Sequence, residues 1–206
     1  MNSFSQNRED LSVLNYFGDY AGTALDIGAN SIHLSNSELL MINGWGAVLI
    51  EPSPQVFPDL EKLNSHRDNV YCINVAVSDY NGKSKFYDSG THLKSGDKAL
   101  LSSLSKEEIK RWGNTTDFDE IEVDVVDFKT LLNLSPYKQF EFISIDAEGE
   151  DLKILKQMDL TELNCKCLCI EYNSHEQTLN EIKDYCSQFG LTNVLLKNAE
   201  NIILSL

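Results

Sequence analysis

The sequence has no long hydrophobic run, and its first residues are not apolar. It begins MNSFSQNRED, where a secretory signal would require an apolar core. No later run of apolar residues approaches the ~20 that a membrane-spanning helix needs. We therefore expect a soluble, cytoplasmic protein that does not have the membrane as a partner.

Basic residues are scarce. Lys and Arg number 17 against 32 Asp and Glu, which gives a formal net charge of -15. Binding to nucleic acid depends largely on Lys and Arg that neutralise phosphates, so nucleic acid is not an expected partner. The same charge disfavours docking on an anionic membrane surface. It leaves the oligomeric state open.

Cysteine pairs with Cys-x-x-Cys spacing are also absent. The five cysteines are an odd number in a chain of 206 residues, which is long enough to bury a core without disulfides, so free thiols are expected. Cys165, Cys167 and Cys169 alternate along one predicted strand, which suits small buried side chains better than a zinc site. With 42% hydrophobic and 24% charged residues, the chain is predicted to form one globular domain over residues 1–206.

Short runs rich in Val, Ile and Leu recur along the chain and predict buried strands at 23–27, 47–51, 70–75, 140–146 and 165–171. Between and after them, helical patterns occur at 35–43, 55–64, 128–132, 150–158 and 177–189. Such alternation predicts a parallel sheet whose crossovers are right-handed.

The last two predicted strands, 193–197 and 201–204, are joined by Asn198, Ala199 and Glu200 alone. So short a link cannot make a parallel crossover, so these strands are expected to form an antiparallel hairpin. The predicted fold is a doubly wound, Rossmann-like α/β sheet of seven strands, mostly parallel with an antiparallel C-terminal hairpin strand. This is the element order of class I methyltransferases, a likeness of fold that by itself says little about function.

Residues 88–118 interrupt the alternation with glycine, serine, lysine and threonine, and contain one predicted short helix near 106–112. Long insertions in compact domains often form lids or binding loops. We expect this segment to be a lid or an acceptor-binding insertion.

Two strand ends carry residues suited to a nucleotide. The first predicted strand leads into Asp26-Ile27-Gly28-Ala29-Asn30, and the second ends at Glu51-Pro52. In doubly wound sheets a glycine turn after the first strand approaches the nucleotide, and an acid some 20 residues later binds ribose hydroxyls. Gly28 and Glu51 fit these positions, and Asp26 or Asn30 could meet the amino acid part of a nucleotide cofactor. A plain turn and a solvated carboxylate are the alternatives.

Several motifs in the same order together resemble the FkbM family of methyltransferases. They are Ser5-Gln6 with Glu9-Asp10, Asp26-Ile27-Gly28-Ala29-Asn30, Gly44-Trp45, Ile50-Glu51-Pro52, Asn74-Val75-Ala76-Val77-Ser78 and Ile145-Asp146-Ala147-Glu148-Gly149-Glu150-Asp151. The resemblance implies a class I fold, S-adenosylmethionine as cofactor, and O-methylation of a hydroxyl on a sugar, glycan or small natural product. Small-molecule or glycan acceptors are the implied partners.

The resemblance and the strand-end residues together give the expected cofactor-binding residues, which are Gln6, Asp26, Gly28, Ala29, Asn30, Glu51, Pro52, Ala76, Val77 and Asp146. The resemblance implies that Ala76 and Val77 border the adenine. The chain departs from the family in the first loop, where Ser31-Ile32-His33 replaces a pair that commonly ends in glycine. Ile32 is expected either to shift the loop or to lower the affinity for the cofactor.

Asp146, at the end of the fourth predicted strand, is the expected catalytic residue, acting as general base or as a metal ligand. Together with Glu171 and Asn173 at the next strand end, it would offer the hard oxygen ligands that suit Mg²⁺. Without a metal, these side chains would cap neighbouring loops, as Glu148 and Glu150 are expected to do at the helix after Gly149. His33 and His175 are alternative bases.

Two other functions remain open at this point. The chain could be a cofactor-binding protein without catalysis, with a regulatory or structural role. It could also be an NAD-dependent oxidoreductase that uses Glu51 on the ribose, although the second and third glycines of the dinucleotide fingerprint are absent and the C-terminal hairpin is unusual for that class.

Overall fold

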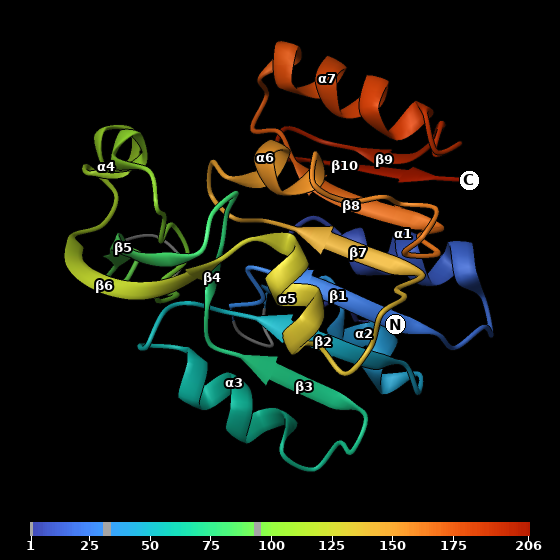
Figure 1. The fold of residues 1–206 in the computed structure, drawn as a ribbon, viewed down its shortest axis with the longest axis horizontal. Coiled ribbons are helices and arrows are strands. Elements are labelled where there is room, and N and C mark those ends of the chain that lie inside the picture. Colours follow the sequence, from blue (N-terminus) through green and yellow to red (C-terminus); the bar gives the residue numbers. More distant parts are fainter. Residues whose placement is uncertain (1, 31–33, 93–95) are drawn as a thin grey trace.

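The computed structural model describes residues 2–30, 34–92 and 96–206. Its centre is a seven-stranded sheet in the order β3-β2-β1-β7-β8-β10-β9 (Figure 1). The strands are β1 (Thr23–Ile27), β2 (Gly46–Ile50), β3 (Val70–Ile73), β7 (Phe142–Ile145), β8 (Cys167–Glu171), β9 (Asn193–Lys197) and β10 (Asn201–Ser205). β1, β2, β3, β7 and β8 are parallel to one another, and β10 is antiparallel to both β8 and β9. The predicted fold class is confirmed.

Helices cover both faces of this sheet. These helices are α1 (Glu9–Phe17), α2 (Glu38–Ile42), α3 (Phe57–Asn64), α5 (Phe128–Leu134), α6 (Asp151–Leu155) and α7 (Glu176–Ser187), while α4 (Lys106–Trp112) lies apart from the sheet. Residues of α5, α6 and α7 share one hydrophobic cluster with the sheet, and residues of α1, α2 and α3 share another on the opposite face. In β2, Val48 and Ile50 belong to the first cluster and Ala47 and Leu49 to the second. Successive side chains of a strand point to opposite faces, so burial on both faces requires the nearly continuous apolar runs seen in the sequence.

A second, three-stranded sheet was not predicted. It contains β4 (Ala76–Val77), β5 (Gly82–Ser89) and β6 (Phe118–Val126) in the order β4-β6-β5. β5 and β6 pair antiparallel along their whole lengths, so the predicted insertion at 88–118 is the connection between two long paired strands. Figure 1 shows this sheet and α4 beyond the edge of the main sheet to which the parallel strands point.

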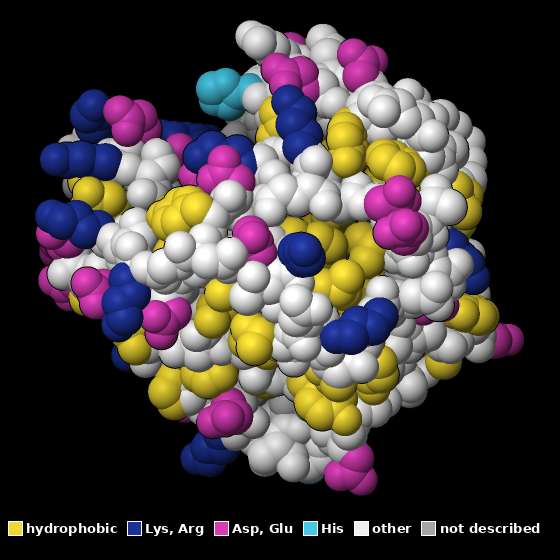
Figure 2. Space-filling model, in the orientation of Figure 1, with side chains coloured by type: hydrophobic (Ala, Val, Ile, Leu, Met, Phe, Trp, Pro, Cys, Tyr) yellow, Lys and Arg dark blue, Asp and Glu magenta, His cyan; other side chains and the backbone are white. Residues whose placement is uncertain are grey.

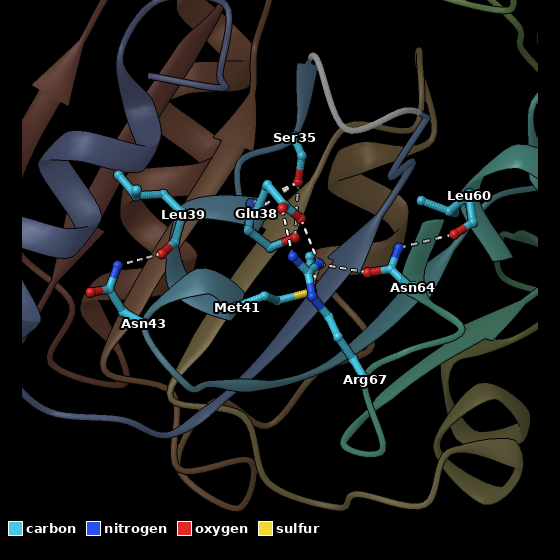
Figure 3. A network of polar contacts seen from close by, with 9 residues as sticks. Ser35, Glu38, Leu39, Met41, Asn43, Leu60, Asn64 and Arg67 are labelled. Atoms are coloured by element: carbon cyan, nitrogen blue, oxygen red, sulfur yellow. Dashed lines mark hydrogen bonds and ion pairs between the residues drawn. The ribbon is translucent and has the colours of Figure 1, made fainter. Parts of the chain in front are cut away.

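A buried ion pair joins α2 to the turn that follows α3. The Arg67 guanidinium donates hydrogen bonds to both carboxylate oxygens of Glu38 at 2.7 Å, and to Asn64 Oδ1 at 2.7 Å. Figure 3 shows the two charged groups facing each other, with Met41 and Asn64 beside them. Only 3% of the Glu38 side chain is exposed, so its charge depends on this partner.

The surface of the small sheet mixes charges of both signs. Lys83 pairs with Glu122 and Lys85 with Glu120 across β5 and β6. Figure 2 shows Lys and Arg beside Asp and Glu over this part of the molecule. Among the described residues, no helix has the length and apolar character needed to cross a membrane. All five cysteines are free thiols, as expected.

Candidate active site

The candidate site lies where the order of the main sheet reverses, at the carboxyl ends of β1, β2 and β7. The first loop is tied to both neighbouring strands: the backbone N–H groups of Gly28 and Ala29 donate to the Ile50 carbonyl at 2.9 Å, and Asp146 N–H donates to the Ile27 carbonyl at 2.9 Å. Gly28 has a φ of +83°, and a Cβ there would lie 1.8 Å from the Asp146 carbonyl oxygen. Only glycine fits this close approach of two backbones. Open α/β sheets bind their ligands in the crevice at such a reversal.

A first cavity opens at this point. Eight of the ten expected cofactor-binding residues line it, namely Gln6, Gly28, Asn30, Glu51, Pro52, Ala76, Val77 and Asp146. Lining residues outside the expected cofactor-binding set include Leu34, Ile50, Val75, Phe86, Ala99, Leu100, Ser102, Leu104 and Glu148. We name this space the cofactor cavity.

Asp26 and Ala29 do not line the cofactor cavity. The Asp26 carboxylate is buried under the strand ends, where it accepts a hydrogen bond from Ser37 Oγ at 2.6 Å. Burial raises the pKa of Asp26 to about 6, against the hydrogen bonds from Ser37 and Ser144, which lower it. Ala29 packs into the hydrophobic cluster on the α1 and α2 face. The structure gives both residues a role in shaping the loop, and their contact with a cofactor stays a prediction.

Glu51 is held rigidly at the end of β2. Its Oε1 accepts a hydrogen bond from Ser53 N–H at 2.7 Å, and its Oε2 accepts one from Asn30 N–H at 2.9 Å. Burial raises the pKa of Glu51 to about 7, these two hydrogen bonds lower it, and the charges of Asp88 and Asp26 add to the rise. The carboxylate therefore connects the first loop to the second and faces the cavity in a fixed orientation.

Residues of the predicted insertion cover the cofactor cavity. Ala99, Leu100, Ser102 and Leu104 line it, and the segment is attached to the first loop by a hydrogen bond from Asn30 Nδ2 to the Lys98 carbonyl at 3.1 Å. The open space beneath the segment is about 70 Å³. Cofactor sites typically measure roughly 300–1,000 Å³, so the segment has to move outward before a nucleotide-sized ligand can bind. We name residues 98–104 the covering segment.

A second cavity, of about 350 Å³, adjoins the first. The two share Gln6, Leu34, Leu100, Asp146 and Glu148, so Asp146 lies at their junction. The second cavity is otherwise lined by His92, Asp97, Leu101, Trp112, Glu171, Asn173, Glu200 and Asn201. We name it the acceptor cavity. Trp112 comes from α4, so the insertion contributes to both cavities.

Three carboxylates meet in the wall of the acceptor cavity. Asp146, Glu148 and Glu171 each place one oxygen so that all three oxygens lie within 4.8 Å of one another. Burial raises the pKa of Asp146 to about 8 and those of Glu148 and Glu171 well above their ordinary value, and the neighbouring carboxylates add to each rise. We name these residues the carboxylate cluster.

The expectation for Glu148 was wrong. Glu148 does not cap the following helix, because the Asp151 carboxylate accepts the hydrogen bonds from Ala147 N–H and Gly149 N–H there. Instead, Glu148 has a left-handed φ of 45° and lines both cavities. The sequence alone does not distinguish the acids at 146, 148, 150 and 151. The path of the loop decides which of them line the cavities and which bond to the start of the helix.

The remaining expected site residues divide as follows. Asn173 lines the acceptor cavity together with Glu171, and its role as a metal ligand stays a prediction. His175 lines a third hollow with Arg111 and Glu108, which shares Glu171 and Asn173 with the acceptor cavity but is not lined by Asp146. Ile32 and His33 lie outside the described residues.

Comparison with solved structures defines the class of fold. The METTL16 methyltransferase domain, 12% identical, matches with a TM-score of 0.51 over 95% of this chain and 64% of that one. The N-terminal domain of human METTL16 in complex with SAH (15% identity, TM-score 0.47) matches over 95% of this chain and 65% of that one. A candidate RNA methyltransferase from Pyrococcus horikoshii (11%, TM-score 0.49) matches over 96% and 82%. The chain thus has the class I methyltransferase fold, and it spans less than two thirds of the length of these two METTL16 domains.

The family follows from the sequence. The profile of the methyltransferase FkbM domain matches residues 26–199, which is most of the chain. The protein therefore belongs to the FkbM family of methyltransferases. A comparison with curated protein sequences gave no match.

Proposed function

We propose that this protein uses S-adenosylmethionine to methylate a hydroxyl group on a sugar, a glycan or a small natural product. One observation carries the proposal: the family motifs line a cavity at the reversal point of the sheet, and that cavity joins a second one at Asp146. A methyltransferase needs two such adjoining spaces, because the acceptor must approach the methyl group in line.

The residues around the cofactor cavity suit S-adenosylmethionine. Gly28 lines the cavity without a side chain that would fill it, and Glu51 keeps free lone pairs for ribose hydroxyls beside its two backbone hydrogen bonds. Ala76 and Val77 give the cavity an apolar wall suited to an adenine ring. When bound, the cofactor would supply an electrophilic methyl group on its sulfonium.

Asp146 is the residue placed to act on the acceptor. It lies at the junction of the cavities, where the hydroxyl and the methyl group would meet. As the new C–O bond forms, the C–S bond of the sulfonium would break and leave a neutral thioether, and the hydroxyl proton would pass to the Asp146 carboxylate. Because burial raises the pKa of this group to about 8, its ionised form is a stronger base than an ordinary carboxylate.

The acceptor cavity suits an uncharged, polyhydroxylated acceptor. Asn173, Asn201 and Gln6 offer amides that can hydrogen-bond to hydroxyls, and Trp112 offers a ring face for stacking. The acids in its wall would repel phosphate groups. Together with the net charge of -15, this supports a small-molecule or glycan acceptor in place of RNA.

The cofactor can be tested by calorimetric titration of S-adenosylmethionine and S-adenosylhomocysteine. Glu51→Ala removes hydrogen bonds to a charged group worth about 1.5–3 kcal/mol, so affinity should fall roughly ten- to a hundredfold. Glu141→Gln is the matched control, since Glu141 is a buried acid at the opposite end of the sheet that binds Thr23 N–H. It should lower stability without changing affinity. Equal affinity in wild type and Glu51→Ala would contradict the proposal.

Catalysis can be tested with methyl-labelled cofactor and panels of hydroxyl, amine and carboxyl acceptors. Label should enter hydroxyl acceptors, and Asp146→Asn should slow transfer by about 10²–10⁴-fold while leaving the cofactor affinity within a few-fold of wild type. Cofactor binding without transfer to any acceptor would instead favour a non-catalytic cofactor-binding protein.

A further inference from the structure

We propose that Asp146, Glu148 and Glu171 bind one divalent cation that prefers oxygen ligands, such as Mg²⁺ or Mn²⁺, in the wall of the acceptor cavity. The site itself is argued from these residues alone. Only its role in catalysis rests on the proposed function.

The geometry suits a single ion. One oxygen from each carboxylate lies within 4.8 Å of the other two. Hard cations sit about 2.0–2.6 Å from their oxygen ligands, so two ligands on opposite sides of an ion are separated by roughly 4–5 Å. A single ion among the three oxygens is therefore within reach of all of them after small side-chain rotations.

Glu148 gives the independent evidence that this place holds a ligand. The residue is only 8% exposed, yet its Oε2 has no hydrogen-bond partner among the described residues. A buried polar atom without a partner is costly, by about 1–3 kcal/mol and more when it is charged. It lines the acceptor cavity, so the missing partner has to come from that space.

Unlike the cluster, the neighbouring acids already have hydrogen-bond or ion-pair partners within the protein. Asp151 accepts two backbone hydrogen bonds, and Glu150 accepts one from Ser78 Oγ and pairs with Lys153. Arg111 weakly favours the charged forms of Glu148 and Glu171, but its guanidinium pairs with Glu108 and stacks on Trp112. The protein thus supplies partners to the acids around the cluster and leaves the cluster itself to a ligand.

The mutual repulsion of the three carboxylates also favours a bound cation. Three ionised carboxylates this close, in a buried wall, repel one another strongly and cannot all stay charged without a cation. Three protein oxygens would also leave open coordination positions on an ion such as Mg²⁺, which takes six ligands in all. An acceptor oxygen bound there would be oriented, and its hydroxyl proton would become more acidic. Asp146 would keep its second oxygen to receive that proton.

The test is direct binding in the absence of cofactor and acceptor. Mn²⁺ is titrated into chelator-treated protein, and free Mn²⁺ is followed by electron paramagnetic resonance beside calorimetry. Wild type should bind one ion per chain, and Glu148→Gln and Glu171→Gln should each weaken binding by about ten- to a hundredfold. Glu200→Gln is the matched control, because Glu200 lines the same cavity outside the cluster. It should leave the affinity within about threefold of wild type, since Glu200 is not a ligand and acts on the cluster only through its charge near Asp146.

A stability measurement distinguishes a loss of metal binding from a loss of folding. Glu148→Gln keeps the shape of the side chain and removes repulsion, so the metal-free variant should unfold at a temperature no lower than wild type. Mn²⁺ should raise the unfolding temperature of wild type more than that of Glu148→Gln at the same concentration, because the ion binds the folded chain only and binds the variant more weakly. The proposal would be overturned by absence of saturable binding, by equal weakening in Glu200→Gln, or by unchanged affinity in both cluster variants.

The same experiments separate this inference from the proposed function. Ion binding without any methyl transfer would support the metal site and contradict its role in catalysis. Methyl transfer that persists in excess chelator, with no ion bound to wild type, would support the proposed function and contradict the metal site.

Discussion

At Gly28 two stretches of backbone lie so close together that the residue has no room for a side chain. The space is closed by the Asp146 carbonyl, and the left-handed φ of +83° adds strain for any other residue. The loop after β1 therefore lies directly against the backbone that follows β7, beneath the cofactor cavity.

Gly28→Ala should therefore lower the free energy of unfolding by about 3 kcal/mol or more, since both the clash and the backbone strain contribute. Urea denaturation measures the loss. Gly44→Ala is the control, because Gly44 has a similar φ of +89° but nothing within 4 Å of the added Cβ. It should cost only about 1–2 kcal/mol. Similar losses of unfolding free energy for the two variants would mean that the close approach of Gly28 to the Asp146 carbonyl does not contribute to stability.

Among elements, α2 and the turn after α3 depend on each other through Glu38 and Arg67. Arg67→Ala leaves a buried carboxylate without its partner, which costs about 3–5 kcal/mol in comparable pairs. With 15% of the Arg67 side chain exposed, we expect a loss near the lower end of that range in urea denaturation.

Lys85→Ala, which removes an exposed partner of Glu120, should change stability little by comparison. The double variant Arg67→Ala/Glu38→Leu should recover part of the loss, since no unpaired charge remains. A double variant less stable than Arg67→Ala would show that side-chain packing, and not the unpaired charge, determines the loss of stability.

The covering segment, residues 98–104, should respond to the cofactor. Because the cavity beneath it is only about 70 Å³, we expect the segment to open for binding and then to close over the ligand. Amide hydrogen exchange in this segment should slow on addition of S-adenosylhomocysteine, while exchange in the remote helix α5 stays the same. Unchanged exchange at 98–104 under saturating ligand would contradict this role.

For the whole molecule, buried acids make stability depend on pH. Burial raises the pKa of Asp26 to about 6 and that of Glu51 to about 7. These groups hold their protons in the folded chain at pH values where the unfolded chain has lost them. Their stabilising effect is complete below the ordinary carboxylate range and is lost as pH rises through 6 and 7.

The ligand-free protein should thus unfold at a lower temperature at pH 7.5 than at pH 5.5, and thermal denaturation followed by circular dichroism checks this. The mutual repulsion of a chain with a net charge of -15 acts in the same direction. Glu51→Gln should flatten the dependence, because the amide does not titrate. A melting temperature that rises from pH 5.5 to 7.5 would contradict the argument.

Prediction from the sequence worked where one local property was enough. The buried strands of the main sheet are continuous apolar runs, so they were placed within a few residues of β1, β2, β3, β7 and β8. The strands β5 and β6 were missed because charged residues interrupt them. Alternation was the available signal: Ile121, Val123 and Val125 alternate with Glu122 and Asp124, which is the pattern of a strand with one exposed face.

The sequence by itself determined the order of helices and strands, the glycine turn at Gly28 and the acid at Glu51, because each depends on neighbouring residues or on the fixed spacing of a βαβ unit. Only the tertiary structure decided which acids meet. Glu148 and Glu171 are brought beside each other by the parallel pairing of β7 with β8, and α4 brings Trp112 to the same cavity from the end of a long insertion. Those distances depend on how strands pair and loops turn, and the local residue pattern does not encode them.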